Sequence, residues 1–151
     1  GRVVGQGRPA DLLSSAWRAE RLEHAPENIL RGTVEACADD VARVALTPDI
    51  SLAVSATGLV SGTRVVLALA ADEILVSTRR PEGLSARNVL SATVSALDAG
   101  PSGVVLRATL DPDGPALDVL LTRASTTALE LAPGKRLFLV LKSNSVRVLS
   151  A

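Results

Sequence analysis

Apolar positions along this chain alternate with polar ones in short runs rich in β-branched residues. Such runs predict ten β-strands, at residues 29–36, 41–46, 51–54, 64–69, 74–77, 89–96, 104–110, 117–121, 137–141 and 146–149. Gly, Pro and Asp are dense between several of them, as at 98–103 and 111–115, which is typical of hairpin turns. The pattern therefore predicts a mainly β protein.

Two segments depart from this pattern and predict helix. Near the start, Leu12, Leu13, Ala16 and Trp17 recur on one helical face after a short Gly-rich strand. The second segment, 125–131, opens with Ser and Thr and is followed by a Pro-Gly pair that would stop a helix. Residues 1–23, a strand plus a short helix, are too few to fold alone and need a neighbouring surface.

The ten predicted strands form two copies of one five-strand repeat. Asn-Ile-Leu at 28–30 matches Asn-Val-Leu at 88–90, and Gly-Thr-Arg-Val at 62–65 matches Gly-Lys-Arg-Leu at 134–137. The offset is larger for the second match because the second copy carries the extra helix. Five strands in roughly 60 residues fit a small OB-type barrel.

We therefore expect two tandem five-stranded OB-like barrels preceded by the strand-helix segment. The boundaries that follow are 1–23, 24–80 and 81–151, with Arg-Arg-Pro-Glu-Gly at 79–83 joining the two barrels. The acidic pairs Asp39-Asp40 and Asp72-Glu73 are predicted to lie in solvated hairpin turns. Asn28 and Asn88 are expected to make turn hydrogen bonds.

Composition narrows the functional classes. Sixteen Lys and Arg balance 16 Asp and Glu, and aromatic residues make up 1%, which argues against nucleic acid as a partner. One Cys and one His exclude disulfide frameworks and Cys/His zinc sites, and a lone Cys fits a reducing cytosol. No apolar run reaches the roughly 18–20 residues of a membrane span. Gly5-Gln6-Gly7 lacks the Gly-Lys-Ser/Thr of a phosphate-binding loop, so we expect no enzymatic activity.

The candidate chemistry lies in three short segments of the second copy. Ser85-Ala86-Arg87 precedes its first strand, Thr122 follows its third, and Lys142-Ser143 follows its fourth. Hydroxyls, cations and the backbone N–H groups of such turns all donate hydrogen bonds. No Asp or Glu lies in these segments, and a fully deprotonated tetrahedral dianion needs only donors. The set therefore favours molybdate, tungstate or sulfate over phosphate, unless the segments are an ordinary turn and a solvated strand end.

The same residues resemble a known family. Gly-Leu-Ser-Ala-Arg-Asn-Val-Leu at 83–90, followed by Lys-Ser at 142–143, is similar to the molybdate-binding Mop domain, also called the TOBE domain. The opening 1–13 resembles the last strand and helix of an ABC ATPase domain. The whole chain is thus similar to the C-terminal region of the ATP-binding subunit of molybdate ABC transporters.

The resemblance implies an oxyanion site between Mop units, built from two segments or two chains. Its residues would be Ser85, Ala86 through its backbone, Arg87, Thr122, Lys142 and Ser143. The first copy departs from the motif, with Pro-Glu at 26–27 and Ala-Ala at 70–71. Since Glu27 would repel a dianion, we expect the first copy to be a structural partner without its own site.

The function implied is the sensing of cytoplasmic molybdate or tungstate and the restraint of transport. The implied partners are a second copy of the chain and, through the parent ATPase at the inner face of the membrane, the transporter's membrane subunits. No metal or other cofactor is expected. Two alternatives remain: a stand-alone molybdate storage protein, and a dimerisation module of a sulfate or sugar transporter ATPase that binds no ligand.

Overall fold

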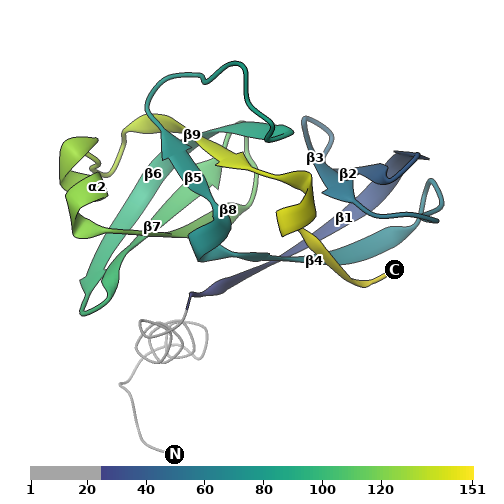
Figure 1. The fold of residues 1–151 in the computed structure, drawn as a ribbon, viewed down its shortest axis with the longest axis horizontal. Coiled ribbons are helices and arrows are strands. Elements are labelled where there is room, and N and C mark those ends of the chain that lie inside the picture. The colour runs from purple at the N-terminus through teal and green to yellow at the C-terminus, as the bar shows by residue number, and fades with distance from the viewer. Residues whose placement is uncertain (1–24) are drawn as a thin grey trace, which may run out of the picture.

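A computed structural model describes residues 25–151 of the 151. The predicted strand and helix within 1–23 lie outside the described residues. The described part consists mainly of two curled five-stranded sheets that lie side by side, joined by short turns (Figure 1). The prediction of a mainly β chain with two tandem five-stranded OB-like units is confirmed.

The strands follow the predicted runs closely. Five belong to the first copy: β1 (Glu27–Ala38), β2 (Val41–Thr47), β3 (Ile50–Ser55), β4 (Arg64–Ala70) and β5 (Leu75–Ser77). Five belong to the second: β6 (Asn88–Gly100), β7 (Gly103–Leu110), β8 (Ala116–Leu121), β9 (Arg136–Leu141) and β10 (Arg147–Ser150). Short 3-10 turns, η1 (Ala71–Glu73) and η2 (Ser143–Ser145), precede the last strand of each copy.

The two copies exchange their last strands. The first sheet has the order β10-β4-β1-β2-β3, and the second has the order β5-β9-β6-β7-β8. Leu75 of β5 therefore pairs with Val140 of the second copy, and Arg147 of β10 pairs with Ala68 of the first. In Figure 1 the chain leaves β9 in one sheet, turns through η2 and ends beside β4 in the other. Each sheet thus takes one strand from beyond the predicted boundary near residue 80.

One apolar core runs through both sheets. Alternation along the strands buries Leu67 and Leu69 from the first sheet and Leu106 and Leu139 from the second in a single cluster. Gly114, in the β7–β8 turn, has no room for a side chain, because a Cβ there would collide with Ile50 of the first copy and Leu110 of the second. The two units are therefore packed as one body.

Two buried asparagines fasten the sheets to each other. Asn88 donates from its amide nitrogen to the Ala53 carbonyl at 2.9 Å and accepts from the Ala53 N–H at 2.8 Å. Asn28 makes the same pair of bonds to the backbone of Asp118, at 2.9 and 2.8 Å. Each asparagine lies at the start of the first strand of one copy, within its first two residues, and binds an edge strand of the other. The expectation that they make turn hydrogen bonds is wrong.

The extra helix begins and ends earlier than predicted. Helix α2 spans Arg123–Ala128, and the Thr122 hydroxyl caps it by accepting from the Ser125 N–H at 3.0 Å. Glu130 then takes a positive φ of 52° and turns the chain away before the Pro-Gly pair is reached. Capping therefore fixes Thr122 at the N-terminal end of α2.

Candidate functional site

The second-sheet strand pair β6–β9 positions two of the three predicted segments. Asn88 of β6 lies opposite Leu141 of β9 in an antiparallel register. The residues just before Asn88 and those just after Leu141 therefore leave the sheet at the same end. This register brings the loop carrying Ser85 and Ala86 next to Lys142.

A cavity of about 370 Å³ lies at this end of the strand pair. Ser85, Ala86 and Lys142 all line it, together with the hydroxyl-bearing Ser145 of η2. Apolar side chains complete its wall: Leu75, Leu84, Val140 and Leu141. The structure thus brings three of the six predicted residues into one concave space that can donate hydrogen bonds to an anion.

The Lys142 ammonium group is available for a ligand. Lys142 is exposed, and its side chain has no carboxylate within ion-pair distance among residues 25–151. Leu141 before it is buried at 2% exposure and fixes the end of the strand. An unpaired cation at the mouth of a partly apolar cavity is a suitable partner for an oxyanion.

Two acidic residues that the sequence analysis placed in a solvated hairpin turn also line this cavity. Asp72 and Glu73 belong to η1 and are exposed. They reach the cavity because the exchanged strand β5, which follows η1, pairs with β9 beside Lys142. The three donor segments themselves contain no Asp or Glu, but the cavity as a whole also presents these two carboxylates. Their place at the cavity follows from the strand exchange, which the repeat pattern in the sequence does not reveal.

Arg87 and Ser143 point elsewhere. Arg87 lines a neighbouring groove of about 470 Å³ with Arg43 and Ala53 of the first copy. The Ser143 and Ser55 hydroxyls share a hydrogen bond of 3.1 Å, so Ser143 is held against the end of β3. Both residues lie on the side of the motif that faces the first sheet.

Thr122 is also outside the cavity in a single chain. Its hydroxyl caps α2 and donates to the Ser125 hydroxyl at 2.9 Å. The strand before it, β8, contacts η1, whereas α2 after it contacts β7 of the second sheet. Ser125 is a further hydroxyl that the sequence analysis did not single out, although its position three residues after a capping Thr is a recognisable signal.

The first copy has different chemistry at the matching positions. Glu27, in the place of Arg87, forms an ion pair with Arg147 of the exchanged strand β10. Ala70 and Ala71 stand in the places of Lys142 and Ser143. The ion pair joins β1 and β10 of the first sheet, and these positions offer no unpaired cation to an anion. In the described part of the chain, no group of three or more His, Cys, Asp and Glu could hold a metal ion.

Comparison with known proteins now adds to this geometry. A family model described as "TOBE domain" matches residues 84–148, which include Ser85, Ala86 and Lys142. Residues 84–148 are thus similar to TOBE domains. The family resemblance stated from the sequence is confirmed.

Curated relatives agree with the family match. The chain is 31% identical over 145 residues to the molybdenum import ATP-binding protein ModC of Rhizobium etli, and 30% identical over 148 residues to that of Rhizobium johnstonii. Each alignment covers 95% of this chain and 40% of the relative. The chain is thus homologous to part of these proteins and spans well under half of their length.

A solved structure matches the fold. The cytoplasmic molybdate-binding protein ModG, in a crystal form with molybdate bound, superposes with a TM-score of 0.72 at 26% sequence identity. The match covers 80% of this chain and 94% of ModG, so both sheets of the TOBE-containing region take part. No helix among the described residues is long and apolar enough to cross a bilayer.

Proposed function

We propose that this chain is the oxyanion-binding regulatory region of the ATP-binding subunit of a molybdate transporter, with molybdate or tungstate as its ligand. The observation that carries the proposal is the meeting of Ser85, Ala86 and Lys142 in one cavity of a TOBE domain. Residues 1–23 would be the tail of the ATPase domain, 24–80 a structural unit and 81–151 the binding unit. The region would work in the cytoplasm, at the inner face of the membrane.

The cavity binds a tetrahedral dianion through donors. The Lys142 ammonium supplies the charge, the Ser85 hydroxyl one hydrogen bond, and the Ala86 N–H another. Charge-assisted bonds of this kind contribute about 1.5–3 kcal/mol each. Asp72 and Glu73, which also line the cavity, oppose the ligand's charge and moderate the affinity. Such moderation suits a sensor, which must release its ligand when the concentration falls.

A second chain completes the site in this proposal. Leu75 and Leu84 are 66% and 48% exposed beside the cavity, and covering them would bury apolar area. We place Thr122 and Ser125 of the second chain over the open cavity, where their hydroxyls add donors. Arg87 and Ser143 keep their proposed binding roles and would turn toward the dianion when the pair closes.

Regulation follows from this shared ligand. A dianion held by two chains binds the closed pair better than the separated one, and it shifts the arrangement only by that difference in affinity. If the pair lies beneath two ATPase domains, the ligand would hold them in one arrangement and slow ATP-driven transport. The membrane subunits of the transporter are then the downstream partners.

A stand-alone molybdate storage protein is the second candidate. It is favoured by the match to ModG, of which 94% is covered by the described fold. Both candidates require oxyanion binding, whereas a dimerisation module without a ligand does not. Whether an ATPase domain precedes residue 1 in the gene separates the first candidate from the second.

Calorimetric titration tests the shared requirement. Molybdate and tungstate should bind the full chain with similar affinity and more tightly than sulfate or phosphate. Lys142→Ala should weaken molybdate binding at least tenfold, whereas Arg64→Ala, which removes an equal charge from the first sheet, should leave it unchanged. No heat from any of the four anions would support the ligand-free module and contradict the proposal.

A further inference from the structure

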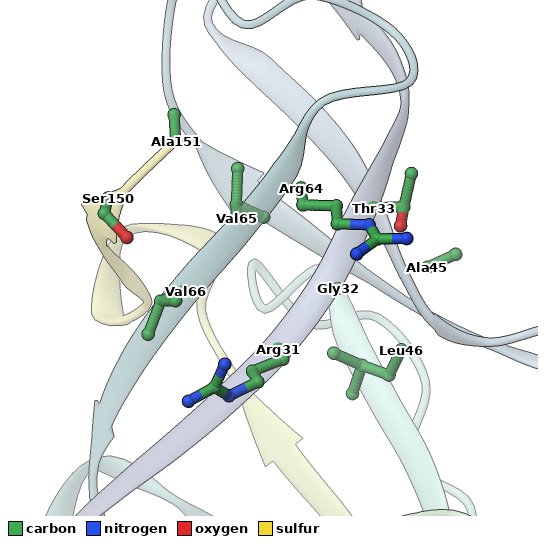
Figure 2. Close-up of a pocket in the computed structure, with 10 residues that line it drawn as sticks. All are labelled: Arg31, Gly32, Thr33, Ala45, Leu46, Arg64, Val65, Val66, Ser150 and Ala151. Atoms are coloured by element: carbon green, nitrogen blue, oxygen red, sulfur yellow. The ribbon is translucent and has the colours of Figure 1, made fainter.

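The outer face of the first sheet carries a second concave site, independent of the TOBE cavity. A groove of about 510 Å³ is lined by Arg31 and Thr33 of β1, by Leu46 of β2 and by Arg64 and Val66 of β4 (Figure 2). A few polar groups over an apolar floor of this volume are typical of sites for small organic ligands. The groove lies in the copy that has no oxyanion motif.

Both arginines of the groove are without a partner. Neither guanidinium has a carboxylate within 4.0 Å or a hydrogen-bond partner among residues 25–151, whereas Arg43, Arg107 and Arg147 are all ion-paired. Figure 2 shows the Arg64 guanidinium turned toward Thr33 and the Arg31 guanidinium turned the other way. The two positive groups therefore stand at different ends of the groove.

The second copy shows which chemistry the matching place accepts. There Thr93 lies opposite Arg136 in the same register in which Thr33 lies opposite Arg64. The Thr93 hydroxyl donates to the Asp111 carboxylate at 3.0 Å. The second copy thus fills the place beside its Thr–Arg pair with a carboxylate of its own.

The first copy leaves that place open and adds a cation. Thr47 stands at the position of Asp111, and Arg31 stands at the position of Ser91. The surface beside this place is also more open in the first copy than in the second. In the second copy Arg80 lies 5.7 Å over the ring of Phe138, whereas Val66, at the matching position, is part of the open groove.

We infer that this groove binds a small organic dicarboxylate, with one carboxylate at Thr33 and Arg64, the other at Arg31, and the apolar spacer over Gly32 between them. Guanidinium groups match carboxylates in a planar, two-bonded geometry. Arg31 and Arg64 are diagonal neighbours on adjacent strands, roughly 7–8 Å apart at their backbones, and their side chains diverge from there. A spacer of three or four methylene groups therefore fits better than one.

The test is a titration of the full chain with malonate, succinate, glutarate, adipate and the monocarboxylate butyrate, followed by NMR of the arginine Nε–Hε signals. Glutarate and adipate should shift the Arg31 and Arg64 signals and bind more tightly than malonate or butyrate. Arg31→Ala and Arg64→Ala should each weaken binding at least tenfold, and the matched variant Arg136→Ala should leave it unchanged.

A third variant tests the comparison between the copies. Thr47→Asp introduces the carboxylate that the second copy carries, so it should block the dicarboxylate while the fold is kept. Lys142→Ala should not alter dicarboxylate binding, which separates this inference from the oxyanion proposal. Equal binding of butyrate, tighter binding of sulfate or molybdate at these arginines, or no shift with any dicarboxylate would overturn the assignment.

Discussion

Lys142, Asp72 and Glu73 set the charge of the cavity at the scale of single residues. The sequence predicts the Lys-Ser pair and the Ser-Ala-Arg segment as neighbours, and the register of β6 with β9 places Ser85 and Ala86 beside Lys142. The two carboxylates could not be predicted, because their position depends on a strand pairing that the alternation of apolar residues leaves open. Local patterns fix a strand's faces but not its neighbours.

Removing these carboxylates gives the prediction at this scale. The double variant Asp72→Asn, Glu73→Gln should tighten molybdate binding about fivefold, since a charge pair some 4 Å apart in water is worth about 1 kcal/mol. Calorimetric titration at low salt measures the gain, and added salt should reduce it. Asp49→Asn, at the far end of β3 from Ser55, is the control. Unchanged or weaker binding in the double variant would show that the carboxylates do not face the ligand.

At the scale of elements, the exchanged strands and the two asparagines decide how the units are joined. The repeat analysis predicts all ten strands and the capped helix, because alternation and turn residues are local signals. It does not predict the exchange of β5 and β10, because each copy presents an equivalent strand with which either of them could pair. It also misses the asparagine bonds, which join residues 35 and 90 positions apart in the sequence.

The asparagine bonds predict a stability effect. Asn88→Ala should lower the free energy of unfolding by about 2–4 kcal/mol, because it leaves the half-buried N–H and carbonyl of Ala53 without partners at about 1–3 kcal/mol each. Urea denaturation followed by circular dichroism measures the change. Asn144→Ala, an exposed asparagine in η2, should change it little. Equal stability of the two variants would contradict the role given to Asn88.

The strand exchange predicts where protection from hydrogen exchange is lost. Val148 of β10 pairs with Leu67 of the first sheet, and Val76 of β5 pairs with Leu139 of the second. Val148→Asp should therefore speed amide exchange in β4, and Val76→Asp should speed it in β9. Mass spectrometry of peptides from the deuterium-labelled protein measures both changes in exchange rate. If Val148→Asp instead speeds exchange in β9 and Val76→Asp speeds it in β4, each copy keeps its own last strand.

At the scale of the whole molecule, the two sheets carry one oxyanion cavity, and we propose that a second chain completes it. The exposed Leu75 and Leu84 beside the cavity and the helix cap at Thr122 lead us to expect a homodimer that molybdate stabilises. Light scattering after gel filtration should give twice the 15.6 kDa of one chain when molybdate is present. Leu84→Asp should shift the mass toward the monomer, and Val60→Asp, at an even more exposed apolar residue outside the cavity lining, should not.

Location of the bound anion tests the central claim most directly. Crystals of the full chain grown with tungstate allow the metal to be found by its anomalous scattering. The account predicts a peak within hydrogen-bond reach of the Lys142 ammonium and the Ala86 N–H, with Thr122 of a second chain close by. A peak elsewhere, or none at a tungstate concentration that saturates binding in solution, would contradict it.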